Sequence, residues 1–287
     1  MIRKIKILIL FLGFVFSSFS QTEFSGLQYI FNPSIINPAA ITTKNMSLQM
    51  YYRNQLSGIE QAPQTQFISF KASLEPTTSI LVGLHNTTAG PSSIGGIQLG
   101  FAHIINLKKV KLSFGLQGEL RRMMLDETKF VLEQENDDAI SYNLQKRINA
   151  QSSAGVYLLA NKWSIGFSTF NLINNKDVYT KIINKEKYLS FNIYADYSYS
   201  WKNKIKFIQS IMFEKDDIKP SKIDINFITK FNDRINLGVT YSTLKSIAVI
   251  LGIQSNQLEI NYIHTIPNSS TSNFLKGTNE LLLIYKF

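Results

Sequence analysis

Polar and apolar residues alternate along most of this chain, in short stretches separated by turn residues. Between residues 223 and 231, for example, Ile225 and Phe227 fall on one side of an extended backbone, while Asp224 and Asn226 fall on the other. Successive side chains of a β-strand point to opposite faces, so this period of two predicts strands. No helical period of comparable length occurs, and we expect an all-β fold.

About fourteen such stretches can be delimited by the turn residues that flank them. They are residues 46–53, 66–74, 79–84, 97–105, 110–120, 152–159, 163–172, 189–201, 205–213, 223–231, 234–241, 247–254, 257–264 and 278–287. An even number of antiparallel strands lets both ends of a closed barrel finish on the same side of a membrane, as in single-chain outer-membrane barrels.

The connections between these strands alternate in length. Short connections are residues 75–78, 106–109, 160–162, 202–204, 232–233 and 255–256. Long connections are residues 54–65, 85–96, 121–151, 173–188 and 265–277, a medium one is residues 214–222, and residues 242–246 complete the series. Tight turns on one rim and larger loops on the other are typical of outer-membrane barrels. A soluble periplasmic β-sandwich, the alternative fold, has no reason to sort its connections in this way. We therefore predict a transmembrane antiparallel β-barrel of about fourteen strands.

The last strand has one wholly apolar face. Leu281, Leu283, Tyr285 and Phe287 share one side of the extended chain, and the sequence ends on the aromatic Phe287. Closing strands of outer-membrane barrels carry such a lipid-facing row, with aromatic side chains at the membrane interface. Leu283, Tyr285 and Phe287 are therefore predicted to act as a C-terminal barrel signal.

The first twenty residues have the composition of a secretory signal peptide. Basic residues precede an apolar run over residues 7–16, and small residues stand at Ser18 and Ser20. We expect cleavage between Ser20 and Gln21. Beyond this segment no run approaches the ~20 apolar residues of a membrane helix. A membrane protein of this sequence must then be a closed barrel, because an open sheet would leave backbone groups unpaired in hydrocarbon. The expected division is a signal peptide at 1–20, a proline-containing segment at 21–45 and the barrel at 46–287.

Composition narrows the functional classes. The 287 residues carry a formal net charge of +10 and no cysteine. The absence of cysteine excludes disulfides, thiolate metal sites and a Cys nucleophile. The positive charge is scattered through turns and polar strand faces and is not gathered on one helix face, which argues against nucleic-acid binding.

Candidate catalytic and metal-binding residues are few. His85, His103 and His264 lie near strand ends in separate hairpins, without a partner at metal-ligand spacing. Zinc and hydrolase sites need several converging groups, so we interpret the three histidines as isolated interface or lumen residues.

Two pairs of adjacent carboxylates, Asp137-Asp138 and Asp216-Asp217, fall in presumed outer loops. A solvated loop is the plainer interpretation, and a weak calcium contact is the alternative. We expect no enzymatic activity, no cofactor and no metal.

A proline-containing block covers residues 24–39. It contains two Asn-Pro pairs, Asn32-Pro33 and Asn37-Pro38, flanked by aromatic residues. Proline cannot donate to a β-ladder and restricts the residue before it. We expect an ordered non-strand element, packed against the barrel wall or into its periplasmic mouth.

A second block, residues 51–66, joins the first two predicted strands. Its motif residues are Tyr52, Arg53, Gln55, Gly58, Ala62, Pro63 and Thr65, and those of the first block are Gln28, Tyr29, Phe31, Asn32, Pro33, Asn37, Pro38 and Ala39. In these residues the two blocks together resemble the PorP/SprF family of the type IX secretion system. The chain departs from the family at Ile30, where Met is usual, and at Leu56, where Trp is usual. The second departure puts in doubt a stacking role at Leu56.

The resemblance implies a non-enzymatic outer-membrane barrel of a Gram-negative bacterium, with tight turns and both termini facing the periplasm. Such proteins support the export or surface anchoring of a cognate secreted protein, often an adhesin of gliding bacteria with a C-terminal sorting domain. The implied partners are that cargo, other type IX secretion components and outer-membrane lipid. A general or substrate-specific porin is the alternative function, because about fourteen strands can enclose either an open channel or a plugged lumen.

Overall fold

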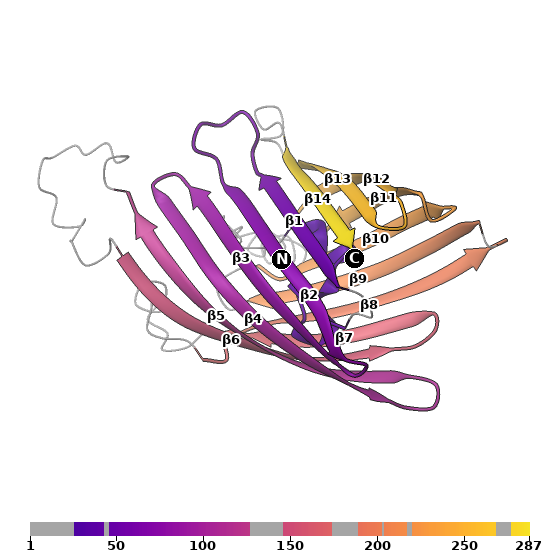
Figure 1. Cartoon of the computed structure of the whole chain (residues 1–287). Helices are drawn as coiled ribbons and strands as arrows, with labels where there is room; N and C mark the ends of the chain where they lie inside the picture. The colour runs from indigo at the N-terminus through magenta and orange to yellow at the C-terminus, as the bar shows by residue number, and fades with distance from the viewer. Residues whose placement is uncertain are drawn as a thin grey trace, which may run out of the picture.

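The architecture is a closed barrel of fourteen antiparallel strands, in which each strand pairs with its sequence neighbours and β1 pairs with β14 (Figure 1). The computed structural model describes residues 26–42, 46–126, 146–173, 189–202, 204–216, 220–267 and 277–287. The strands are β1 (Ser47–Asn54), β2 (Gln64–Glu75), β3 (Thr78–Ala89), β4 (Ser92–Asn106), β5 (Lys111–Leu125), β6 (Lys146–Leu159), β7 (Trp163–Phe170), β8 (Ser190–Trp201), β9 (Ile205–Asp216), β10 (Lys222–Phe231), β11 (Ile235–Ser242), β12 (Ser246–Gln254), β13 (Leu258–Pro267) and β14 (Thr278–Lys286). The predicted barrel and its strand count are confirmed, while the predicted signal peptide at 1–20 lies outside the described residues.

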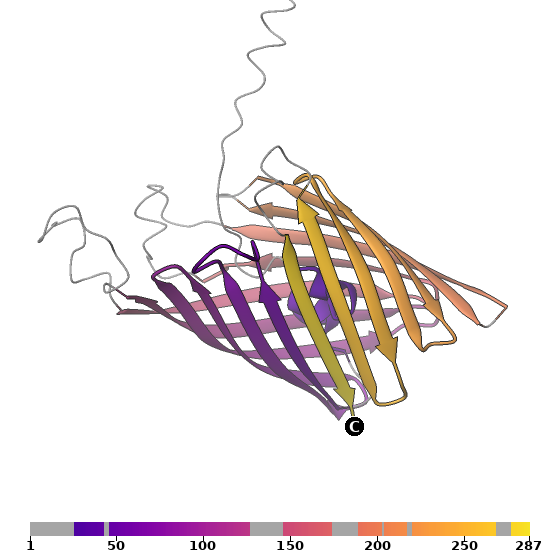
Figure 2. The same cartoon turned by 90° about the horizontal axis from the view of Figure 1, so that it is seen from above.

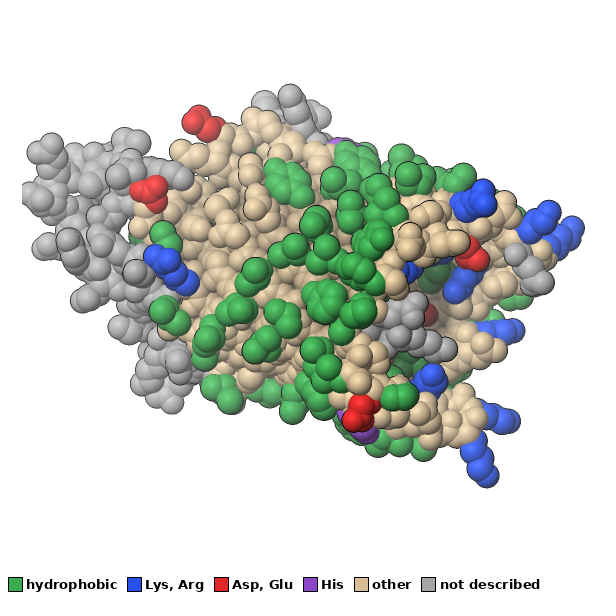
Figure 3. Space-filling view, viewed as in Figure 1, with side chains coloured by type: hydrophobic (Ala, Val, Ile, Leu, Met, Phe, Trp, Pro, Cys, Tyr) green, Lys and Arg blue, Asp and Glu red, His purple; other side chains and the backbone are tan. Residues whose placement is uncertain are grey.

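The two faces of the wall have the predicted alternation. In β10, Asp224 and Asn226 are fully buried in the lumen, whereas Phe227 points outward and is 52% exposed. In β14, Leu281 is 46% exposed and Leu282 is buried. Figure 3 shows the outward apolar side chains spread over the outer wall. Exposed apolar surface of this extent is unusual for a water-soluble monomer and fits a lipid-facing wall.

Most connections on the two rims of the barrel differ in length as predicted, although residues 90–91 and 243–245 of the loop rim are also short. On the turn rim, the connections are residues 76–77, 107–110, 160–162, 202–204, 232–234 and 255–257. On the loop rim, they are residues 55–63, 90–91, 126–145, 171–189, 217–221, 243–245 and 268–277. The start of β1 and the C-terminal Phe287 both lie at the turn rim, since Ser47 pairs with Lys286.

One loop-rim prediction is wrong. Residues 85–96 were expected to form a loop, but β3 continues to Ala89 and β4 begins at Ser92, leaving a tight turn at Gly90 and Pro91. Gly90 has a φ of 56°, a left-handed conformation that glycine adopts without strain. Strand ends that extend above a membrane have water on both faces, so their sequence need not alternate.

The proline-containing segment lies inside the barrel. It forms three 3-10 turns, η1 (Leu27–Ile30), η2 (Pro33–Ile35) and η3 (Pro38–Ala40), and we call residues 26–42 the plug. The two prolines stand at the first position of their turns, where a missing N–H costs little. Figure 2 shows the indigo plug enclosed by the strands. Among the described residues there is no helix with the length and apolar character needed to cross a bilayer.

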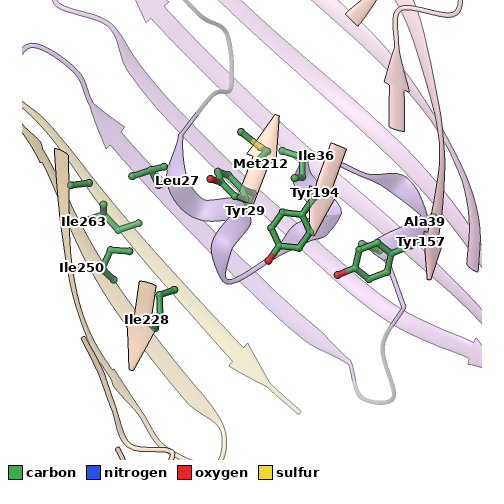
Figure 4. Close-up of a cluster of buried hydrophobic side chains, with 12 residues drawn as sticks. Leu27, Tyr29, Ile36, Ala39, Tyr157, Tyr194, Met212, Ile228, Ile250 and Ile263 are labelled. Atoms are coloured by element: carbon green, nitrogen blue, oxygen red, sulfur yellow. The ribbon is translucent and has the colours of Figure 1, made fainter. Parts of the chain in front are cut away.

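The plug and the inner wall share one apolar core (Figure 4). Its buried members are Leu27, Tyr29, Ile36, Ala39 and Ala40 from the plug, and Tyr157, Tyr194, Met212, Ile228, Ala248, Ile250 and Ile263 from the wall. The rings of Tyr29 and Tyr194 meet edge to face, with centroids 6.0 Å apart. A packed core therefore occupies the middle of the lumen.

Candidate functional site: the plugged lumen and the loop rim

Inward-facing glycines let the plug approach the wall closely. Gly115 of β5 and Gly155 of β6 are paired in register. A methyl group at Gly115 would overlap the backbone of Pro38 and Ala39, and one at Gly155 would overlap the side-chain oxygen of Asn37. These two glycines leave space for η3, so the strands that face the second Asn-Pro pair carry glycine where the plug comes closest to the wall.

Asn37 fastens η3 to the wall. Its Nδ2 donates to the backbone carbonyls of Val156 at 3.0 Å and Phe167 at 3.2 Å. Its Oδ1 accepts from the backbone N–H of Ala39 at 2.9 Å, which caps the turn. A Cβ at Gly166 of β7 would lie 2.7 Å from the same Nδ2. The side chain of Asn37 is thus held by the backbone of β6 and β7, close to a wall position where only glycine leaves it room.

Asn32, in the first Asn-Pro pair, joins a second polar network. Its Nδ2 donates to Oε1 of Gln49, and its Oδ1 accepts from Nζ of Lys71 at 2.8 Å and from Oγ of Ser34 at 2.6 Å. Nε2 of Gln49 in turn donates to Oε1 of Gln28 at 3.3 Å. Asn32 therefore has partners on β1 and β2, and Gln28 has one on β1, although the buried Nε2 of Gln28 has no hydrogen-bond partner.

Tyr29 joins the plug to the opposite wall. Its hydroxyl donates to Oδ2 of Asp224 at 3.2 Å and accepts from Nδ2 of Asn226 at 3.1 Å. Asn226 also donates to Oγ of Ser210 at 2.9 Å and accepts from Oγ1 of Thr240 at 2.8 Å. The polar lumen row of β9 to β11 is thus a connected network around one plug side chain.

Glu280 of β14 binds the beginning of the plug. Its Oε2 accepts from the backbone N–H of Leu27 and from the hydroxyl of Tyr51, each at 2.9 Å. Its Oε1 lies 3.5 Å from Nε of Arg53; the side chain of Glu280 is buried and that of Arg53 is 12% exposed. Arg53, one of the residues that match the family, is therefore linked to the plug through the carboxylate of Glu280.

A small polar cavity of about 110 Å³ lies beside this ion pair, between the plug and the loop-rim ends of β10 to β14. Arg53, Lys222, Asp224 and Glu280 line it. Lys222 Nζ lies 3.1 Å from Oδ2 of Asp224, so the charges around the cavity are paired.

The rest of the second block forms the loop over residues 55–63. The backbone N–H of Gln55 donates to the carbonyl of Pro63 at 2.9 Å, and Gly58 has a φ of 95°. Thr65 is buried next to the loop, while Tyr52 faces outward. The first block therefore forms the plug and the second shapes the loop rim.

A wider cavity of about 550 Å³ opens at this part of the loop rim. Its lining residues are Leu56, Ile59, Glu60, Gln61, Ala62, Pro63, Ala89, Gly90 and Pro91. The backbone N–H of Gly90 donates to the carbonyl of Gln61 at 2.9 Å, which joins the two connections. Leu56, at the position where Trp is usual, lies in this lining.

His85 is not the isolated residue that we expected. Its Nε2 lies 2.6 Å from Oε1 of Glu119, and Nε of Arg121 lies 2.6 Å from the same oxygen. These residues come from β3 and β5, so no sequence spacing could indicate their contact.

The other candidate groups remain separate. His103 Nδ1 lies 3.1 Å from the hydroxyl of Thr78, and His264 Nδ1 lies 2.8 Å from Oδ1 of Asn279. Asp216 is buried at the end of β9. Asp217 and the pair Asp137-Asp138 lie outside the described residues. Within the part of the chain that the structure describes, no three His, Cys, Asp or Glu side chains gather as a metal site would require.

Solved structures with a similar fold are outer-membrane barrels. The outer membrane protein Omp33 of Acinetobacter baumannii has a TM-score of 0.54 and 4% identity, over 85% of this chain and 98% of its own. The toluene transporter TbuX of Ralstonia pickettii has a TM-score of 0.53 and 8% identity, over 91% and 93%. A mutant of the monoaromatic hydrocarbon channel TodX has a TM-score of 0.51 and 9% identity, over 92% and 94%. At these identities the likeness concerns the fold alone.

No curated protein matches the sequence. A family model does, over residues 18–285, and its description is type IX secretion system membrane protein PorP/SprF. The match covers both sequence blocks, the plug that the first block forms and the closed barrel around it. This chain therefore belongs to the PorP/SprF family of type IX secretion system membrane proteins, with the fold of an outer-membrane β-barrel.

Proposed function

We propose that this barrel supports the export or cell-surface anchoring of a cognate secreted protein, an adhesin-like cargo with a C-terminal sorting domain. The observation that carries the proposal is the plug. Its side chains are hydrogen-bonded to β1, β2, β6, β7 and β10, the backbone N–H of Leu27 is hydrogen-bonded to β14, and its apolar residues share a core with the wall. A lumen packed in this way suits a protein that holds a partner better than one that passes solutes.

The loop rim is the part of the molecule that we assign to the cargo. The cavity beside the 55–63 loop, at about 550 Å³, falls in the size range of ligand pockets. Ile59 and Leu56 give it an apolar lining, and Glu60 and Gln61 give it polar groups. An extended cargo segment would place an apolar side chain there and bond its backbone to the loop. Gliding motility through a surface adhesin, and contact with other secretion components, are the biological roles that this proposal implies.

The test is a pull-down of the tagged barrel from its native outer membrane. We expect a cell-surface protein with a sorting domain to be recovered. Ile59→Glu replaces an apolar side chain of the cavity with a charged one. The loss of an apolar contact worth ~1.4 kcal/mol lowers the affinity for the cargo about tenfold, and recovery should fall accordingly. Ile173→Glu is the control, since Ile173 is also exposed at the loop rim and lines neither of the two cavities described above. Repeated recovery of no such protein, or equal recovery with Ile59→Glu, would contradict the proposal.

A general or substrate-specific porin is the second candidate. The hydrocarbon channel and toluene transporter among the similar structures favour it, as proteins of like fold. Planar-bilayer recordings separate the two functions. A steady open-pore current from the purified barrel supports the porin, and electrical silence supports the anchor.

A further inference from the structure

Exposed cations gather on one part of the turn rim. Four consecutive hairpin turns, from β4–β5 to β10–β11, carry them, and we call these residues the basic arc: Lys108, Lys109, Lys111, Lys162, Lys202, Lys204 and Arg234. The described residues of the same turns include one exposed acid, Asp233. In Figure 3 the blue side chains on the right mark the projecting hairpins of this arc.

The basic arc directly adjoins the lipid-facing surface. Leu107, Trp163, Trp201 and Ile235 each stand next to a member of the arc in the sequence, and all four side chains are exposed. Both tryptophans of the chain are therefore at this rim. Tryptophan favours the headgroup level of a bilayer, where its ring is apolar and its N–H is wet. The cations thus stand at the depth where a lipid leaflet carries its phosphates.

The cations of the arc are available for an external anion. Among the described residues, no ion pair includes any member of the arc, whereas inward lysines such as Lys222 and Lys230 are paired with carboxylates of the lumen. Nζ of Lys202 lies 4.9 Å from the ring centroid of Trp201, a contact that leaves its N–H donors free toward the headgroup region. Lysines in this position extend their ammonium groups to the interface while their alkyl stems cover apolar surface.

We propose that the basic arc binds the phosphate groups of anionic phospholipids in the leaflet around the turn rim. The charges follow the edge of four hairpins and line neither of the two cavities described above, which suits a row of headgroups rather than one docked protein. The predicted periplasmic position of the turn rim assigns the arc to the phospholipid leaflet rather than to lipopolysaccharide. The proposal is independent of the cargo and holds for either function considered above.

The two tryptophans provide a native probe for this site. The purified barrel is reconstituted in vesicles of phosphatidylcholine with a varied fraction of phosphatidylglycerol, each lipid in turn brominated near the headgroup end of its acyl chain. Quenching of Trp163 and Trp201 then measures the relative binding of the two lipids at the arc. We expect phosphatidylglycerol to be favoured by about threefold or more at low salt, and the preference to disappear near 1 M salt, where the Debye length is about 3 Å.

Charge variants locate the effect. Lys109→Gln with Lys162→Gln should reduce the preference, and adding Lys108→Gln and Lys204→Gln should bring it close to one. Arg122→Gln with Lys215→Gln removes two exposed cations near the loop rim and should leave the preference unchanged. All substituted side chains are exposed, and the gel shift of the unheated barrel verifies that each variant folds.

Four results would overturn the proposal. Three of them are equal quenching by both lipids in the wild type, a preference that survives the four turn-rim substitutions, and a preference lost in the loop-rim control. Displacement of phosphatidylglycerol from the tryptophans by added lipid A at equal phosphate would also overturn it, because the leaflet assigned here would then be the wrong one.

Discussion

Replacing Gly115 with alanine should loosen the plug without unfolding the barrel. The added methyl group would overlap the backbone of Pro38 and Ala39, which cannot move aside as the end of a flexible side chain can. Overpacking of this kind costs about 1–3 kcal/mol. Because β5 is hydrogen-bonded to β4 on one side and β6 on the other, we expect the plug to shift rather than the strand. The seated state of the plug should then be destabilised by this amount relative to the open state.

A thiol in the plug makes the shift measurable. The chain has no cysteine, so Ser34→Cys, at a plug position that is 2% exposed, gives a single reporter. A maleimide reacts with it only when the plug opens, and the rate follows the open population when opening is fast. A loss of about 1–3 kcal/mol raises that population about 5- to 140-fold, and the labelling rate of Gly115→Ala should rise accordingly.

Gly118→Ala is the matched control. Gly118 lies three residues further along β5, and a Cβ there would meet no atom within 4 Å. Its labelling rate should equal that of the parent protein. If Gly115→Ala and Gly118→Ala label at the same rate while both barrels remain folded, the close approach of plug and wall described here is wrong.

Three further predictions concern the plug and the orientation of the barrel. Asn37→Ala removes two hydrogen bonds to strand carbonyls and should weaken plug seating by about 2 kcal/mol, seen as faster labelling in the same assay. Glu280→Gln leaves Arg53 buried without its counter-ion and should lower the free energy of unfolding by about 3 kcal/mol in urea titrations. Adding Arg53→Met should cost less than the sum of the single changes, and strict additivity would argue against the ion pair. On whole cells, an impermeant maleimide should label Glu60→Cys but reach Lys109→Cys only after permeabilisation, and the reverse pattern would invert the assigned topology.

Most of the barrel could be predicted because a lipid-embedded wall enforces alternation. Each strand must present apolar side chains to hydrocarbon, so the period of two survives even in short segments such as residues 163–170. Where a strand extends beyond the lipid, its sequence no longer needs to alternate, and the strand cannot be recognised from the pattern. The stretch over residues 85–96 has no clean alternation, and its continuation of β3 and β4 was missed for that reason.

The plug could be predicted as ordered and non-strand, but its position inside the lumen could not. Periodicity reports which side of a strand is apolar, and it does not report what fills the space enclosed by the polar side. The inward positions of Gly115, Gly155 and Gly166 were the available signal, because glycine on the lumen row of a strand marks close approach by another backbone. Glu280 carried no signal, since its partner Leu27 is 253 residues away in sequence.

That long-range bond has a consequence for how the molecule is made. The plug is encoded before the first strand, yet the seam between β1 and β14 encloses it and the last strand holds its beginning. Stable seating of the plug therefore requires the last strand to be in place, and a chain shortened by one hairpin would lose the seam and the plug's attachment together. We expect the lumen of this protein to become fully occluded only when its wall is complete.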